Sequence, residues 1–188
     1  MTGVEGVRAE PEQDFWVFAY GSLIWNPGFA YKSREPARLR GYHRRYCIQS
    51  KIYRGTADAP GLVLGLEKGG DCEGIAYEVA GQLRSVTMDY LRERELRTSV
   101  YHETIVGIET RDGRAHVAYT YVADPAHSQY VPINEVGAIV NIIEQAVGTA
   151  GSNYEYAINT WSNLSAFGIS DPAVERVAVE LMRRSQRA

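Results

Sequence analysis

The stretch "FWVFAYGSLIWNPGF", residues 15–29, constrains the fold more than any other part of the chain. Residues 15–20 are apolar or aromatic without alternation, which predicts a strand buried on both faces. Gly21 and Ser22 then interrupt the run before apolar residues resume. Such a turn exposes consecutive backbone N–H groups, which can bind a carboxylate or a phosphate. A plain turn within a core strand explains the same residues, since Gly and Ser are ordinary turn formers.

The rest of the chain divides into strands first and helices last. Asp112-Gly113 is a strong hairpin signal, and Asp171-Pro172 supplies an N-cap and the first residue of a helix. This order favours an α+β fold over a wound parallel sheet, and twisted strands joined by loops suit a small barrel with helices outside it. The expected strands are residues 38–50, 61–69, 72–79, 101–110 and 115–123, and the expected helices are residues 85–97, 133–147, 153–168 and from 172 onward.

Length and composition fit one globular domain. The chain has 188 residues, of which 45% are apolar and 23% charged, ordinary values for a domain with a sizeable core. We expect a disordered polar tail over residues 1–14 and a single domain over residues 15–188. The tail lacks the apolar core of a signal peptide, and no apolar run approaches the roughly 18 residues that span a bilayer. The sequence therefore predicts a cytoplasmic protein with no membrane partner.

Charge and residue spacing argue against two further classes of site. A formal net charge of −3 disfavours a nucleic-acid partner. The four histidines show no metal-ligand spacing, so no metal site is expected. Cys47 and Cys72 are expected to be reduced core thiols rather than a disulfide. The oligomeric state is left open.

The first expected helix carries a candidate general base. Met88, Leu91 and Glu95 are three and four residues apart and share one face, whereas Glu93 falls nearly opposite Met88. If the apolar stripe packs inward, Glu95 lies at the edge of the core, where partial desolvation raises the pKa of its carboxyl, as a general base requires. A solvated glutamate between two arginines is the alternative interpretation. Tyr90, on another side, could instead mark the buried face.

Taken in order, these segments resemble the ChaC-type γ-glutamylcyclotransferases. The resemblance runs from Trp16 to about Asp171 and rests on "WVFAYGSLIWNPGF", "RRY" followed by "RGT…PG", "EGIAYEV", "YLRERE" and "GSNYEYAINTWSNLSAFGISD". The first and last of these are long and specific. The resemblance implies a γ-glutamylcyclotransferase-like small mixed β-barrel flanked by helices, with the C-terminal helices packed outside. It also implies no metal and no organic cofactor.

The resemblance further implies a reaction and its residues. The reaction is cleavage of a γ-glutamyl amide, most typically that of glutathione, into 5-oxoproline and cysteinylglycine by attack of the substrate's own amine. Glu95 would be the general acid and base. A non-catalytic module that binds γ-glutamyl compounds, or a cyclotransferase for another γ-glutamyl amine or peptide, is the alternative. The implied substrate-binding residues are Val17, Phe18, Ala19, Tyr20, Gly21, Ser22, Leu23 and Tyr156.

Two positions depart from the family pattern. Ala19 stands where the family often has Gly. After Glu95, the segment "LRTSVY" lacks the glycine commonly found there, although Tyr101 is kept at a comparable spacing. In the family this segment shapes the side of the pocket that holds the leaving group, so the departure concerns the amine partner more than the reaction type.

Overall fold

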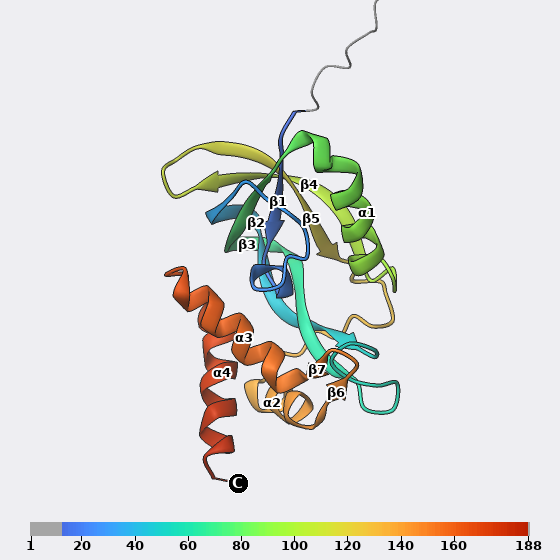
Figure 1. Cartoon of the computed structure of the whole chain (residues 1–188). Coiled ribbons are helices and arrows are strands. Elements are labelled where there is room, and N and C mark those ends of the chain that lie inside the picture. Colours follow the sequence, from blue (N-terminus) through green and yellow to red (C-terminus); the bar gives the residue numbers. More distant parts are fainter. Residues whose placement is uncertain (1–12, 188) are drawn as a thin grey trace, which may run out of the picture.

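The chain folds around a closed five-stranded barrel, seen in a computed structural model that describes residues 13–187 (Figure 1). The strands follow the order β1-β3-β2-β4-β5 around the barrel. β1 and β5 are parallel and the other neighbours antiparallel, so the predicted mixed α+β barrel is confirmed. The predicted tail, residues 1–14, lies almost wholly outside the described residues. The strands are β1 (Phe15–Ala19), β2 (Ser33–Ser50), β3 (Gly61–Val79), β4 (Tyr101–Thr110) and β5 (Ala115–Ala123).

β1 is a buried strand, as its unbroken apolar run predicts. It lies between β3 and β5, and four of its five residues are buried. Trp16 is half-buried and its ring centroid lies 4.2 Å from that of His116. Neither face of β1 is left to solvent, which explains why its sequence does not alternate.

β2 and β3 are longer than the sequence predicts. Residues 61–69 and 72–79, expected as two strands, form one strand that stays paired with β2. The register shifts between Arg40 and Tyr42, opposite Gly69 and Gly70, whose φ angles are 100° and 70°. Glycine adopts positive φ without strain, so the strand bulges there instead of ending.

Helices follow the strands. The expected helix 85–97 is α1 (Arg84–Glu95), preceded by the short 3₁₀ helix η2 (Gly81–Leu83). A second 3₁₀ helix, η1 (Ser22–Ile24), follows β1, and a small pair, β6 (Val147–Gly148) and β7 (Gly151–Ser152), precedes the last two helices. The C-terminal helices are α2 (Val136–Gln145), α3 (Asn153–Ala166) and α4 (Pro172–Ser185).

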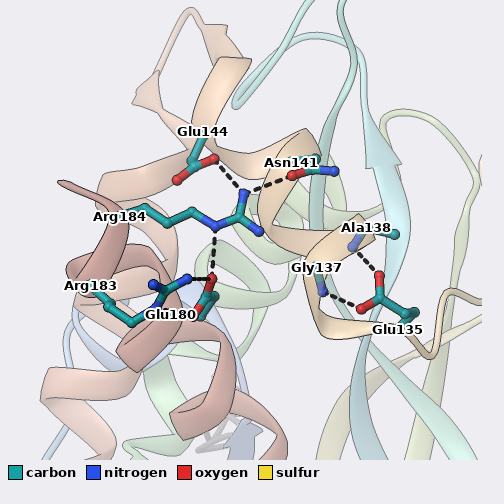
Figure 2. A network of polar contacts seen from close by, with 8 residues as sticks. All are labelled: Glu135, Gly137, Ala138, Asn141, Glu144, Glu180, Arg183 and Arg184. Carbon is teal, nitrogen blue, oxygen red and sulfur yellow. Dashed lines mark hydrogen bonds and ion pairs between the residues drawn. The ribbon is translucent and has the colours of Figure 1, made fainter. Parts of the chain in front are cut away.

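The three C-terminal helices pack together beside the barrel, as predicted (Figure 1). The Asp171 side chain accepts hydrogen bonds from the first turn of α4, and Glu135 does the same for α2, which is why α2 begins at Val136 rather than at 133. Figure 2 shows Arg184 of α4 donating to Asn141 and Glu144 of α2, at 2.7 and 3.1 Å. These contacts fix α4 against α2 on the polar side of an apolar interface.

Three observations bear on the expected classes of site. Cys47 and Cys72 are free and buried, which confirms the prediction of core thiols. Within residues 13–187, no helix is long and apolar enough to cross a membrane. Over the same range, no group of three or more His, Cys, Asp or Glu side chains is placed to hold a metal ion.

Candidate active site

A cavity of about 850 Å³ lies where β1 ends. Its wall combines the turn after β1, the segment after β2, the end of α1, and residues of β3, β4, β5 and α3. These elements are distant in sequence and are brought together by closure of the barrel. The predicted site residues that line the cavity are Phe18, Tyr20, Gly21, Ser22, Leu23, Glu95 and Tyr156.

Val17 and Ala19, also expected as substrate-binding residues, do not line the cavity. Both are completely buried in the core. Side chains alternate along a strand, so Phe18 and Tyr20 point to one side of β1 while Val17 and Ala19 point to the other. Their side chains therefore pack in the core.

The turn after β1 leaves backbone donors open. Gly21 precedes η1, and no side chain in the described part of the protein caps that end of η1. The N–H of Ile24 donates to the Gly21 carbonyl at 3.0 Å, but no acceptor within residues 13–187 pairs with the N–H groups of Gly21, Ser22 or Leu23. A Cβ atom on Gly21 would stand 3.3 Å from the Tyr156 hydroxyl. A side chain there would therefore enter the space in front of these donors.

Glu95 ends α1 and faces the same cavity. Met88 and Leu91 are buried as the predicted stripe requires, and the Glu95 side chain is 18% exposed. Burial raises the pKa of the Glu95 carboxyl above its ordinary value, although the positive charge and hydrogen bond of Arg94 oppose the rise. Glu93 is exposed, in line with its expected position opposite Met88, yet it also lines the cavity.

Arg94 ties the end of α1 to the turn after β1. Its Nε lies 3.1 Å from Glu95 Oε1, and its Nη2 donates to Ser22 Oγ at 2.9 Å. Its Nη1 donates to the Asn26 carbonyl at 2.6 Å and to the Tyr90 hydroxyl at 2.9 Å. One guanidinium thus fixes the distance between the carboxylate of Glu95 and the open turn.

Tyr156 of α3 completes the wall opposite Gly21. Its hydroxyl accepts a hydrogen bond from the Leu64 N–H at 3.1 Å, and its own proton has no acceptor among the described residues. Burial raises the pKa of Tyr156, and the charge of Glu95 adds to that rise. The hydroxyl therefore stays protonated and can donate into the cavity.

Three further tyrosines surround Glu95. The Tyr20 hydroxyl donates to the Tyr121 carbonyl at 2.8 Å, and the Tyr101 hydroxyl donates to the Leu64 carbonyl at 2.9 Å. Burial is the main cause that raises the pKa of all three, and Glu95 raises it further. These tyrosines are uncharged at neutral pH, and together they surround the Glu95 carboxylate with an environment of low polarity.

Comparison with known proteins agrees with this architecture. Residues 15–184 match the family described as "ChaC-like protein". The chain belongs to the ChaC-like family. It is 31% identical to an Escherichia coli protein named "Glutathione-specific gamma-glutamylcyclotransferase", over 92% of this chain and 74% of that protein. It is 34% identical to human "Glutathione-specific gamma-glutamylcyclotransferase 1", over 78% of this chain and 68% of the human one.

A solved structure shares the ChaC-like fold seen here. The crystal structure of a yeast γ-glutamyl cyclotransferase specific to glutathione superposes with a TM-score of 0.84 at 20% identity. The match covers 92% of this chain and 97% of the yeast chain. At that identity the likeness supports the barrel and its flanking helices.

Sequence reasoning missed some cavity residues of this ChaC-like chain. Tyr121 lies within a correctly expected strand, but nothing in its local pattern marks which face meets the cavity. Arg54 lies in the "RGT" segment that carried part of the resemblance, and a charged residue within such a segment was an available signal. The tie between Arg94 and Ser22 joins residues 72 positions apart, which no local pattern reports.

Proposed function

We propose that this chain is a γ-glutamylcyclotransferase that cleaves the γ-glutamyl amide of glutathione into 5-oxoproline and cysteinylglycine. The names of its relatives support the reaction, and one observation in this chain carries it. The largely buried carboxylate of Glu95 shares a cavity with the open turn after β1, and Arg94 holds the two together. A base beside an anion-binding turn suits a substrate that carries an ammonium and a carboxylate on one carbon.

The turn holds one end of the substrate. The N–H groups of Gly21, Ser22 and Leu23 bind the α-carboxylate, as unpaired donors at the start of a helical turn do. With that end fixed, the γ-glutamyl chain curls so that its amine meets its own γ-carbonyl. Well-oriented intramolecular attack of this kind is worth roughly 7–11 kcal/mol of the barrier.

Glu95 carries the protons. Its carboxylate removes a proton from the α-ammonium, and the amine then attacks the γ-carbonyl carbon to form a five-membered ring. The ring nitrogen then loses its second proton, and the C–N bond to the cysteine nitrogen breaks. Glu95 passes the two protons in turn to that nitrogen, which leaves as an ammonium. The chain supplies no covalent nucleophile, because the substrate carries its own. A raised pKa suits Glu95 to this exchange, since a carboxyl of ordinary pKa is a poor acceptor for an ammonium proton.

Tyr156 contributes from the other wall. We assign its free hydroxyl proton to the substrate, where it donates to an oxygen of the curled γ-glutamyl group. A neutral donor in a site of low polarity stabilises charge that develops on a carbonyl oxygen during attack. The assignment follows the position of the hydroxyl beside Gly21.

A substrate panel tests the proposal. Purified protein is incubated with glutathione, γ-glutamyl dipeptides and γ-glutamylamines, and 5-oxoproline is measured by mass spectrometry. Release from glutathione is the expected result. Release only from another γ-glutamyl compound supports the alternative substrate class, whereas saturable binding without 5-oxoproline supports a non-catalytic module; either contradicts the proposal.

A further inference from the structure

The cavity continues past the residues assigned to the γ-glutamyl group. Further polar lining comes from the end of β2 and the segment after it, the segment after α1 and the loop after β5. None of these residues has a role in the chemistry described above. They are Gln49, Lys51, Arg54, Arg97, Thr98 and Gln129.

The charge of the cavity differs in sign from that of the whole chain. The formal net charge of the chain is −3. The cavity lining nevertheless holds four basic side chains, Lys51, Arg54, Arg94 and Arg97, against the two acidic ones, Glu93 and Glu95. Arg94 and Glu95 neutralise one another at 3.1 Å. The other basic groups therefore bias the cavity toward an anionic ligand.

Arg54 is the most enclosed of these three remaining cations. Its side chain is 15% exposed, and its guanidinium carbon lies 5.8 Å from the centroid of the Tyr156 ring. Nη1 donates to the Ser152 carbonyl at 3.1 Å. Among residues 13–187, the only ion-pair partner of Arg54 is Glu155, whose Oε2 lies 3.9 Å from Nη1. The Glu155 side chain is 63% exposed, so solvent screens this pair.

Two donor groups of Arg54 stay available. Within residues 13–187, Nε and Nη2 donate to no acceptor, and neither is a buried orphan atom. A guanidinium presents paired N–H donors that match a carboxylate. Partly enclosed, it binds such a group more strongly than an exposed cation would.

The backbone holds Arg54 in place independently of its side chain. Its N–H donates to Ser50 Oγ at 3.0 Å. The segment before it accepts from the β6–β7 turn, with Thr149 N–H to the Ile52 carbonyl and Ala150 N–H to the Tyr53 carbonyl, both at 2.9 Å. The position is therefore organised before any ligand arrives.

We propose that Arg54 binds the terminal carboxylate on the leaving half of the substrate, so that this one side chain sets the preference for leaving groups that end in a carboxylate. The inference rests on the proposed function and names a specificity-determining residue of that same site. A leaving dipeptide extends about 7 Å beyond the scissile amide. That reach suits a guanidinium that flanks the Tyr156 ring, whose hydroxyl stands beside Gly21.

The test compares glutathione with its C-terminal amide, which differs only in lacking the terminal carboxylate. We expect wild-type kcat/KM to favour glutathione by about 10- to 100-fold, the range for a charge-assisted hydrogen-bonded pair. In Arg54→Gln the preference should shrink to about threefold or less, mainly through a higher KM for glutathione. Arg54→Lys, which keeps the charge, should restore part of the preference.

A matched control removes the same charge elsewhere. Arg40→Gln alters an exposed arginine outside the cavity lining and should keep the wild-type preference. Equal loss for both substrates in Arg54→Gln would assign Arg54 only to holding Ser152, and would overturn the proposal. Equal wild-type turnover of both substrates would overturn it even if Arg54→Gln fails to fold. Absence of 5-oxoproline from both would overturn the proposed function itself.

Discussion

Gly21 sets how closely a ligand can approach the turn after β1. Its φ of −133° lies outside the left-handed region, and the space in front of the residue is limited. A Cβ would already stand 3.3 Å from the Tyr156 hydroxyl. Larger side chains at this position would meet Tyr156 and cover the open N–H groups.

Gly21→Val should therefore weaken substrate binding more than it weakens the fold. We expect KM for glutathione to rise about tenfold or more, since the α-carboxylate loses its donors. Steady-state kinetics of 5-oxoproline release provide the measurement, with thermal unfolding as the control for folding. An unchanged KM would show that the turn does not hold the carboxylate.

The raised pKa of Glu95 predicts how the stability of the protein depends on pH. Because burial raises its pKa in the folded state, the folded protein binds this proton more tightly than the unfolded chain does. The contribution of this proton to stability is fully present below the pKa that Glu95 has in the unfolded chain. It is lost as the pH rises through the higher pKa that Glu95 has in the folded protein. Glu95→Gln has no such loss. The Tm of the variant minus that of the wild type should therefore increase as pH rises from the ordinary glutamate value of 4.5 toward neutrality. A pH-independent difference would contradict the raised pKa.

At the scale of elements, the start of α4 is joined to the barrel through a buried charge. The Arg44 side chain of β2 is completely buried, and its Nε lies 3.4 Å from Asp171 Oδ2. Its Nη2 donates to the Glu73 carbonyl, while Nε and Nη1 have no hydrogen-bond partner among residues 13–187. Asp171 thus caps α4 and also supplies the carboxylate nearest to this guanidinium.

Asp171→Ala should lower the free energy of unfolding by about 2–4 kcal/mol. The N-cap accounts for about 1 kcal/mol, and the rest comes from a buried guanidinium left without its counter-ion, discounted because Asp171 is partly exposed. Urea unfolding measures the change. Asp171→Asn keeps the cap and removes the charge, so its free energy of unfolding should lie between those of the wild type and Asp171→Ala. If it unfolds like the wild type, Arg44 does not depend on the carboxylate.

Elements were easier to predict than the contacts between them. The strand at Phe15, the hairpin at Asp112-Gly113 and the cap at Asp171 follow from local residues, whose physics is short-range. The full length of β3 could not be predicted in this way, because Gly69 and Gly70 indicate the end of a strand unless the pairing with β2 is known. Pairing partners lie far away in sequence, and no single window of residues contains both.

For the candidate site too, local features could be predicted from the sequence, whereas contacts between distant residues could not. The resemblance brought Glu95, Tyr156 and the turn after β1 together without any local signal for their proximity. The inward stripe of α1 could be read from helical spacing, but the choice between a buried and a solvated Glu95 could not. That choice depends on contacts between segments distant in sequence, such as the hydrogen bond from Arg94 to Ser22.

At the scale of the whole molecule, the two thiols report on cooperative unfolding. Cys47 is 0% and Cys72 is 2% exposed, and burial raises the pKa of both. Neither should react with a thiol reagent at neutral pH until the barrel opens. Labelling followed by mass spectrometry should therefore show modification of both cysteines only across the main denaturant transition. Rapid modification of the native protein would contradict the closed barrel.

The central claim is that one carboxylate, that of Glu95, moves the protons beside an anion-binding turn. The most direct measurement is the rate of 5-oxoproline release from glutathione by Glu95→Gln, with Asp89→Asn, an exposed acid on the same helix, as the control. General acid–base catalysis predicts a fall in kcat of about 10²–10⁴-fold for Glu95→Gln and none for the control. A folded Glu95→Gln protein that releases 5-oxoproline at the wild-type rate would contradict the account.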